Sequence, residues 1–332
     1  MQYHKEWTPK RVCIPCALYP MLLYLLYSSM DDIKRTMFIF DSHIHEKIKI
    51  RTPHAYCVKE RIRFPLFLRI KYWYLTNIKW HYYNSCQLFG LDFMWYLIGH
   101  RDFTYLEDCP DVYTIWETGH LYKEWLNYKQ KPQLVKWMNR MVFGGVYKNY
   151  VGTSSNVKKL VVTAPVKRVY LEGKRIEVVS LQKMWNESTE EKKQYILSIY
   201  DIGEEDIEWL KSKPYILYTQ PFSEDKIMSE KEKIDLYAHI LSKYDVDKVI
   251  IKKHPRDRTD YERHIPSVGV FNKICPTQLL DIIGVRYKRA ITVSSTSVLS
   301  IPYPVEIDYI GNEVHSKLLE AYGHQELSMH NR

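Results

Sequence analysis

The sequence predicts an α/β protein built from two doubly wound domains with mostly parallel sheets. Two observations lead to this fold class. Short runs rich in β-branched and aromatic residues alternate with helical patterns along most of the chain. The chain has 332 residues, 45% of them hydrophobic, which is enough for two domains with a core each.

The first half shows this alternation with one interruption. The expected elements are a strand at 11–15, a helix near 18–28, a strand at 36–41, a helix near 86–98 and a strand at 103–108. Residues 47–83 have no clear period, and no element is assigned there. The pattern favours a parallel sheet with helices between the strands.

The second half gives a clearer β-α-β-α-β series. The expected elements are a strand at 215–220, a helix opened by a capping box at Ser229 and Glu232, a strand at 247–254, a helix at 276–283 and a strand at 289–294. Between the halves lie the charged segments 186–193 and 203–213, where we place a hinge. The two domains are therefore expected at 1–200 and 201–332.

The positive charge belongs to the first half. The net charge is +9, of which residues 1–150 carry +8, from 21 basic and 13 acidic residues. Nine Lys and Arg lie between Lys47 and Lys79 with one acid, Glu60, and many aromatic residues. Nucleic acid, an anionic membrane surface or an anionic substrate would explain such a region. The absence of a helix-turn-helix, zinc-finger or RNP motif argues against nucleic acid.

Six scattered cysteines do not form a disulfide pattern, which favours a reducing, cytoplasmic compartment. Cys13 and Cys16 have zinc-ligand spacing but no second pair to complete a site. Asp245 and Asp247 precede a strand and are interpreted as a turn. We expect no metal, and no helix that spans a membrane, because Pro15 and Pro20 interrupt the longest apolar run.

Polar clusters follow four of the predicted strands, where ligands of doubly wound domains bind. They are Glu107-Asp108, Thr219 to Asp225, Lys252 to His254, and Ser294 to Ser297. Strand alternation places Lys252 and His254 on one face. A cation, a titratable donor and a hydroxyl cluster at one edge predict a phosphorylated ligand. Carboxylates at the same edge are candidates for a general base.

Residues 214–300 resemble glycosyltransferase family 52, the bacterial sialyltransferases of lipooligosaccharide and capsule synthesis. The matching segments are YILYTQPFSED, IIKKHPRDRTDY, CPTQLLDIIG and ITVSSTSVL. Bacterial sialyltransferases also share an acidic motif, a His-Pro motif and a Ser-Ser/Thr motif. Here these are Glu107-Asp108-Cys109, His254-Pro255, and Ser295-Thr296 or Ser294-Ser295.

The resemblance implies the GT-B architecture, two facing Rossmann-like domains, with the acceptor on the N-terminal domain and the nucleotide sugar on the C-terminal one. It implies that His254 contacts the CMP phosphate and assists its departure, and that Ser294, Ser295 and Thr296 bind the same phosphate. Lys252 would contact the nucleotide, and Gln278 the ribose. Asp225, beside Glu224, would be the general base, and Asp108, beside Glu107, is the rival for that role.

The implied reaction is inverting transfer of sialic acid from CMP-sialic acid to a galactose-type terminus of a surface glycan. It needs no cofactor, since CMP leaves with a single phosphate that His254 and the hydroxyls stabilise. We expect a lipid-linked acceptor, a location at the inner face of the cell membrane with the basic region against anionic lipid, and a homodimer as a further partnership.

Two departures from the family pattern keep alternatives open. Cys109 stands where the acidic motif has glycine, and Gln278 stands where a glutamate usually approaches the ribose. A glutamine still accepts a hydrogen bond but carries no charge. The alternatives are a transferase of the same family with another nucleotide-sugar donor, such as a glucosyl nucleotide, and a nucleic-acid-binding protein.

Overall fold

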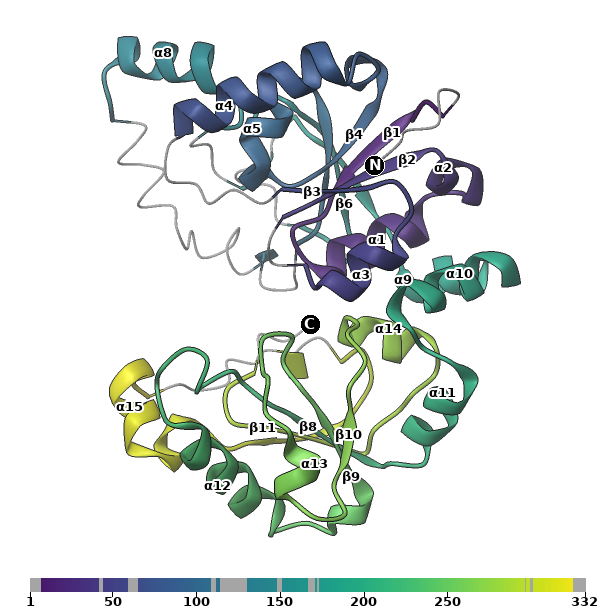
Figure 1. Cartoon of the computed structure of the whole chain (residues 1–332), viewed down its shortest axis with the longest axis vertical. Coiled ribbons are helices and arrows are strands. Elements are labelled where there is room, and N and C mark those ends of the chain that lie inside the picture. The colour runs from purple at the N-terminus through teal and green to yellow at the C-terminus, as the bar shows by residue number, and fades with distance from the viewer. Residues whose placement is uncertain are drawn as a thin grey trace. The chain divides into compact units, whose positions relative to one another are not determined.

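The computed structural model describes residues 7–41, 44–58, 65–108, 112–113, 130–147, 151–166, 171, 173–295, 297–298 and 301–324. The chain divides into two compact units, Met1–Ile199 and Tyr200–Arg332 (Figure 1). Each unit is built around its own parallel sheet and has its own hydrophobic core. The division lies beside the boundary that we expected between residues 200 and 201.

Unit 1 contains a seven-stranded parallel sheet with the order β3-β2-β1-β4-β5-β6-β7. Its strands are β1 (Arg11–Ile14), β2 (Thr36–Phe40), β3 (Ala55–Cys57), β4 (Gln87–Gly90), β5 (Phe103–Leu106), β6 (Val157–Val162) and β7 (Arg175–Val178). The chain first builds outward from β1 to β3 and then returns to the other side of β1 with β4. This order is that of a Rossmann-like sheet, with its switch point between β1 and β4.

Helices cover both faces of this sheet. They are α1 (Leu18–Tyr27), α2 (Met30–Lys34), α3 (Glu46–Arg51), α4 (Pro65–Tyr74), α5 (Trp95–Ile98), α8 (Gln133–Phe143), α9 (Leu181–Asn186) and α10 (Glu190–Tyr200), with the π-helical turn η1 (Leu75–Lys79) and the 3₁₀ turns η2 (Tyr83–Ser85) and η3 (Asp92–Met94). Val12 belongs to the same buried cluster as Leu68 of α4. On β2, Phe38 instead packs edge-on against Tyr24 of α1. The unit is therefore doubly wound (Figure 1).

Unit 2 contains a five-stranded parallel sheet with the order β10-β9-β8-β11-β12, again a Rossmann-like order. The strands are β8 (Tyr215–Tyr218), β9 (Val249–Lys252), β10 (Gly269–Phe271), β11 (Arg289–Thr292) and β12 (Glu306–Tyr309). The helices are α11 (Glu204–Lys211), α12 (Glu230–Leu241), α13 (Tyr261–His264), α14 (Thr277–Ile282) and α15 (Ser316–Tyr322), with the turns η4 (Val246–Lys248) and η6 (Asn312–Val314). No helix of the described residues is long and apolar enough to cross a membrane.

The capping box predicted at the start of α12 is confirmed. The Ser229 hydroxyl accepts a hydrogen bond from the Glu232 amide at 3.2 Å. The Glu232 carboxylate accepts one from the Ser229 amide at 2.8 Å. This reciprocal pair satisfies two amides that would otherwise lack helical partners, and it fixes where α12 begins.

The helix that we expected near 86–98 is wrong. Residues Gln87–Gly90 form β4, which pairs with β1, and only Trp95–Ile98 are α-helical. The hydrophobic pattern of a short apolar run fits a buried strand and a buried helix equally well. Gly90 is the clue, because a Cβ at this position would lie 3.0 Å from the Ile14 carbonyl oxygen. The charged segments 186–193 and 203–213, expected as a hinge, are largely helical in α9, α10 and α11.

Candidate functional site

The carboxyl ends of three strands in unit 2 lie at one level of the sheet. Tyr218, the last residue of β8, pairs with Lys252 of β9 on one side and with Thr292 of β11 on the other. The strand order reverses between β8 and β11, which is where doubly wound domains bind ligands. The segments after these strands, beginning at Thr219, Lys253 and Val293, therefore meet at the edge that the sequence predicted.

His254 lies in the turn after β9 and its ring is oriented by the backbone. Nδ1 accepts a hydrogen bond from the Arg256 amide at 3.1 Å. In the neutral ring the proton must then be on Nε2. Burial and the positive charge of Arg256 lower the pKa of His254 below its ordinary value. At neutral pH the imidazole is thus a neutral donor through Nε2, suited to a phosphate oxygen.

Lys252 is buried, with 6% of its surface exposed, and its ammonium is held by the segment after β10. Nζ donates to the Cys275 carbonyl at 3.1 Å and lies 5.4 Å from the centre of the Phe271 ring. Strand β9 ends at Lys252, so strand alternation does not extend to His254. The hydrogen-bond contacts of Lys252 Nζ are the Cys275 carbonyl and, at 3.8 Å, the Cys275 sulfur. Lys252 therefore places an ammonium group beneath this edge.

The carboxylates of Glu224 and Asp225 have different surroundings. Glu224 accepts hydrogen bonds from Lys233 Nζ at 2.9 Å and from the Arg258 amide at 2.6 Å. Burial alone would raise the pKa of Glu224, but hydrogen bonds, led by these two, and the charge of Lys233 outweigh it and lower the pKa. Asp225 accepts hydrogen bonds from both terminal nitrogens of Arg256, with Nη2 at 3.0 Å from Oδ2. Glu224 is hence a structural anion, whereas Asp225 is partly exposed and is paired with the exposed side chain of Arg256.

A buried network fixes the turn that carries His254, and the sequence did not reveal it. Asp257 accepts hydrogen bonds from Lys233 at 3.0 Å, from Tyr261 at 2.9 Å and from Thr219 at 2.5 Å. The Thr219 hydroxyl in turn accepts one from the His254 amide at 3.3 Å. The side chains of Lys233 and Asp257 are both fully buried. Because Lys233 comes from α12, the network joins β8, α12 and the turn after β9.

The hydroxyl cluster after β11 forms a tight turn. The Ser295 amide donates to Thr292 Oγ1 at 2.8 Å, and Ser295 Oγ accepts from the Ser297 amide at 3.3 Å. Ser295 is buried and Ser294 is half-buried. Thr296 lies outside the described residues. Gln278 is the second residue of α14 and is half-buried.

The acidic pair at the end of β5 in unit 1 divides into two roles. Glu107, 1% exposed, accepts hydrogen bonds from Tyr19 at 3.0 Å and from Tyr113 at 2.6 Å, and it binds the Thr163 amide. Burial raises the pKa of Glu107, although these hydrogen bonds oppose the rise. Through these hydrogen bonds, Glu107 therefore links α1, β5 and the end of β6.

Asp108, the other member of that pair, also has a raised pKa. Burial, and next the carboxylate of Asp41, raise the pKa of Asp108 to about 6. Asp41 follows β2 directly, so the rule that selected the other strand ends would also have found it. Cys109, the departure from the acidic motif, lies outside the described residues.

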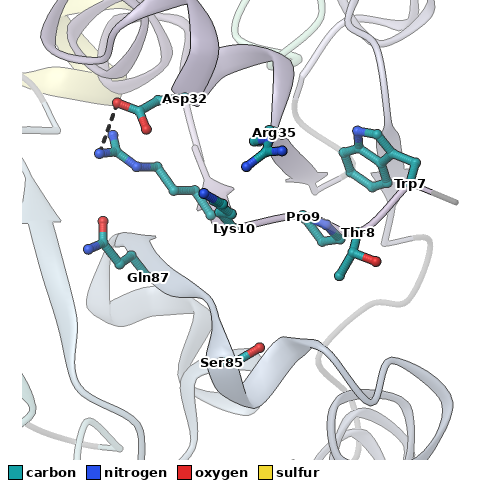
Figure 2. A pocket seen from close by; sticks show the side chains of 9 residues that line it. Trp7, Thr8, Pro9, Lys10, Asp32, Arg35, Ser85 and Gln87 are labelled. Atoms are coloured by element: carbon teal, nitrogen blue, oxygen red, sulfur yellow. Dashed lines mark ion pairs between the residues drawn. The ribbon is translucent and has the colours of Figure 1, made fainter.

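The opposite edge of the unit 1 sheet carries a cavity of about 640 Å³, shown in Figure 2. Lys10, Arg11 and Arg35 line it at the amino-terminal ends of β1 and β2, together with Trp7 and Ser85. Asp32, its single carboxylate, is paired with Arg11 at 3.0 Å. The cavity therefore lies at the amino-terminal ends of the strands of unit 1, whereas Asp41, Glu107 and Asp108 lie at the carboxyl-terminal ends. Among the described residues, no three His, Cys, Asp or Glu side chains are grouped as metal ligands.

Comparison with known proteins gives the family. The model of glycosyltransferase family 52 matches residues 105–316. The chain belongs to glycosyltransferase family 52. A family 52 member is a glycosyltransferase, so the expectation of an enzyme of this class is confirmed. An uncharacterized protein of Haemophilus influenzae is 32% identical over 327 residues, covering 92% of this chain and 95% of that one.

Three solved structures share the fold of this family 52 chain. An α/β-galactoside α-2,3-sialyltransferase of Photobacterium phosphoreum has a TM-score of 0.55 at 11% identity, covering 91% of this chain and 90% of that one. A 2,6-sialyltransferase of a Photobacterium species, solved with CMP and lactose, has a TM-score of 0.54 at 11% identity, covering 94% and 75%. A Photobacterium damsela sialyltransferase reaches 0.50 at 10% identity, covering 94% and 78%. The GT-B fold predicted from the sequence is confirmed.

Proposed function

We propose that this family 52 glycosyltransferase is an inverting sialyltransferase that uses CMP-sialic acid. The observation that carries the proposal is the orientation of His254, whose Nδ1 is engaged by the Arg256 amide and whose Nε2 is left to donate. A nucleoside monophosphate leaving group needs such a donor at its one phosphate. The similar 2,6-sialyltransferase was solved with CMP and lactose, which supports this choice of donor and a galactose-terminated acceptor.

On the donor side, we propose that CMP-sialic acid binds at the carboxyl ends of β8, β9 and β11. His254 Nε2 donates a hydrogen bond to the phosphate as negative charge develops on it. The hydroxyls of Ser294, Ser295 and Thr296 bind the other phosphate oxygens. Lys252 contributes its charge to the nucleotide side of the site. Gln278 accepts a hydrogen bond from a ribose hydroxyl.

In the proposed reaction, an acceptor hydroxyl attacks the anomeric carbon of the sugar from the face opposite the phosphate. The bond from that carbon to the phosphate oxygen breaks, and its electron pair leaves with CMP. The acceptor proton passes to a carboxylate base. No metal enters this scheme, and we expect EDTA to leave the rate unchanged.

Asp225 and Asp108 are the two candidates for that base, and the structure gives each a distinct difficulty. Asp225 binds Arg256 through both oxygens, so this pair must open or turn before Asp225 accepts a proton. Asp108 is buried, but a pKa of about 6 suits proton abstraction at neutral pH. We propose Asp225 as the base and keep Asp108 as its rival.

A second candidate function is a family 52 transferase with a different nucleotide-sugar donor. Gln278 favours it, because a neutral amide replaces the carboxylate expected toward the ribose. Donors that leave as diphosphates carry more charge than one neutral histidine can stabilise. This candidate therefore predicts further cationic groups at the phosphate, for which Lys252 lies in unit 2 and Arg256 would first have to leave Asp225.

A donor screen tests the proposal directly. The protein is incubated with lactose and, in turn, with CMP-sialic acid, UDP-glucose and GDP-mannose, and release of the nucleotide is measured. We expect release of CMP alone, accompanied by a sialylated product with inverted anomeric configuration. Turnover with a nucleoside diphosphate sugar and none with CMP-sialic acid would support the second candidate instead. Hydrolysis of CMP-sialic acid without a glycan product would mean that lactose is not an acceptor and that the acceptor belongs to another class.

We further propose a lipid-linked surface glycan, of lipooligosaccharide or capsule, as the acceptor and the inner face of the cell membrane as the location. A homodimer remains a prediction. Comparing transfer to lactose with transfer to the same sugar on a lipid carrier tests the acceptor. We expect the lipid-linked form to have the higher kcat/KM. Equal values would remove the reason for a membrane location.

A further inference from the structure

Arg256 and Asp225 form an ion pair that joins the turn after β9 to the segment after β8. Both terminal nitrogens of Arg256 donate to the Asp225 carboxylate, with Nη2 at 3.0 Å from Oδ2. This two-point contact is the arrangement in which a guanidinium recognises a carboxylate. The same contact keeps Asp225 from accepting a proton until Arg256 turns away. An anion that competes for Arg256 would remove that obstacle.

This ion pair lies near the surface, whereas the neighbouring one is buried. The side chain of Arg256 is 58% exposed and that of Asp225 is 29% exposed. Lys233, which holds Glu224, has a fully buried side chain and also contacts Asp257. Exposed ion pairs contribute little to stability, but breaking a buried one is costly. Arg256 can therefore exchange Asp225 for another carboxylate at small cost, and Lys233 cannot leave Glu224 in the same way.

The main chains on both sides of the ion pair are fixed by other contacts. The Asp225 amide donates to the Pro221 carbonyl at 2.8 Å. The Arg256 amide donates to His254 Nδ1 at 3.1 Å, and the Asp257 amide donates to the His254 carbonyl at 2.9 Å. Opening the ion pair therefore requires only the side chain of Arg256 to move. The Asp225 carboxylate keeps its support when Arg256 leaves.

The ion pair lies close enough to His254 for its charges to act on the imidazole. Burial is the largest cause of the lowered pKa of His254, and the positive charge of Arg256 is the next. The carboxylates of Asp257, Asp225 and Glu224 oppose both. Arg256 is two residues from His254 and has a long, exposed side chain. It can thus reach a group that is attached next to the phosphate that His254 contacts.

Sialic acid offers a carboxylate at that place. Its anomeric carbon carries the phosphate oxygen of CMP and also a carboxylate, so the two anionic groups of the donor are neighbours on one atom. An aldose donor, such as a glucosyl nucleotide, has a hydrogen in place of the carboxylate. A histidine for the phosphate and an arginine for the carboxylate, on one turn of the chain, match this pair of anions.

We propose that Arg256 binds the carboxylate of the donor sugar and that this exchange releases Asp225 to act as the base. The Asp225 carboxylate stands in for the sugar carboxylate on Arg256, and donor binding replaces one by the other. The inference rests on the proposed sialyltransferase reaction and adds the residue that selects a carboxylated sugar. It also makes the base available only when a donor of the right kind is bound.

Calorimetric titration of the full-length protein, with the acceptor omitted, tests which part of the donor Arg256 contacts. CMP carries the phosphate without the carboxylate, and CMP-sialic acid carries both. We expect Arg256→Gln to raise the Kd of CMP-sialic acid by roughly 10- to 100-fold, the range for a hydrogen-bonded charge. The Kd of CMP should stay unchanged, which also shows that the variant is folded. Arg256→Lys should fall between, because an ammonium lacks the planar fork.

Asp225→Asn tests the exchange itself. Removing the carboxylate that competes for Arg256 should strengthen binding of CMP-sialic acid by about two- to fivefold, the amount that an exposed ion pair sets. This gain should exceed any gain for CMP, and transfer to lactose should be lost. If the ion pair only supports the two segments, Asp225→Asn leaves donor binding unchanged or weakens it.

The methyl ester of CMP-sialic acid removes the same contact from the side of the substrate. If Arg256 binds this carboxylate, Arg256→Gln weakens binding of the ester far less than binding of the acid, because the ester has already lost the contact. Arg263→Gln is the matched control, since Arg263 is exposed in α13 and its loss removes the same charge from unit 2. We expect the control to leave the Kd of both donors unchanged.

Several results would overturn the inference alone. Equal weakening of CMP and CMP-sialic acid by Arg256→Gln would place Arg256 on the phosphate. Unchanged binding of both would make the contact with Asp225 a surface ion pair only, and an equal effect of Arg263→Gln would make net charge responsible. In each case the unchanged protein still binds CMP-sialic acid and transfers the sugar. A failure of the unchanged protein to bind CMP-sialic acid would instead remove the proposed function and this inference together.

Discussion

At the scale of single residues, His254 combines two tasks that a substitution can separate. Its Nδ1 holds the turn by accepting from the Arg256 amide, and its Nε2 is free to donate. An asparagine side chain can accept from the same amide but cannot reach the phosphate with a donor. We expect His254→Asn to lower kcat by about 10² to 10⁴-fold without loss of stability.

Steady-state kinetics and urea unfolding measure the two effects. His254→Ala is the companion variant, which loses both the donor and the contact with the Arg256 amide. We expect it to be as inactive as His254→Asn and less stable. An asparagine variant that keeps a large part of the activity would mean that His254 serves only the turn.

The pKa of Asp108 distinguishes the two candidate bases. Burial and the Asp41 carboxylate raise it to about 6, and a base must be deprotonated to act. If Asp108 is the base, kcat/KM rises with pH and is half-maximal near pH 6. Removing the negative charge with Asp41→Asn then lowers this pKa, so the midpoint moves to a lower pH.

The pH profiles of Asp41→Asn, Asp108→Asn and Asp225→Asn decide the matter. Asp102→Asn is the control, since Asp102 is exposed and paired with Lys158. If Asp225 is the base, Asp41→Asn leaves the midpoint in place and Asp225→Asn is the inactive variant. Our proposal of Asp225 expects this second pattern.

At the scale of elements, the ion cluster around Lys233 joins α12 to β8 and to the turn after β9. Lys233→Met leaves the carboxylates of Asp257 and Glu224 without their cation in a buried place. Breaking a buried pair in this way costs about 3–5 kcal/mol. We expect this loss in the free energy of unfolding measured with urea.

The neighbouring Lys231 is the control for the same helix, because its side chain is exposed. We expect Lys231→Met to change the free energy of unfolding by less than about 0.5 kcal/mol. Equal effects of the two substitutions would show that the cluster around Lys233 adds little. The structural role of Asp257 would then need another explanation.

At the scale of the whole molecule, the two units have separate buried cores. We expect two unfolding transitions in calorimetry, of which Lys233→Met lowers only one. Since the proposed donor site is made of unit 2 residues, CMP should raise that same transition. At 100 times its Kd, CMP adds about 2.7 kcal/mol. A CMP effect confined to the other transition would place the nucleotide on unit 1.

Much of the fold could be predicted from the sequence, because buried strands and capped helices leave local patterns. The strand before Thr219 and the capping box at Ser229 are examples. The strands β3, β6, β7, β10 and β12 were not predicted, since they are short or partly exposed and carry weak alternation. The run around Gly90 was predicted as a helix because β4, with three of its four residues buried, lacks the alternation of a half-exposed strand.

The candidate site was predictable where one segment carries the signal and not where distant segments meet. His254 stood out through Pro255, which favours an extended conformation before it. The partnership of Asp257 with Lys233 joins residues 24 positions apart and leaves no local pattern.

The strand order has a consequence for synthesis of the protein. In each unit the strand made first, β1 or β8, becomes an interior strand of the sheet, and the strand that covers its second edge comes much later. While the ribosome adds the residues between Tyr218 and Arg289, β8 presents a bare hydrogen-bonding edge. The same holds between Ile14 and Gln87 in unit 1. Each nascent half is thus exposed to mispairing until β4 or β11 emerges, and chaperones are expected to engage the chain in these two intervals.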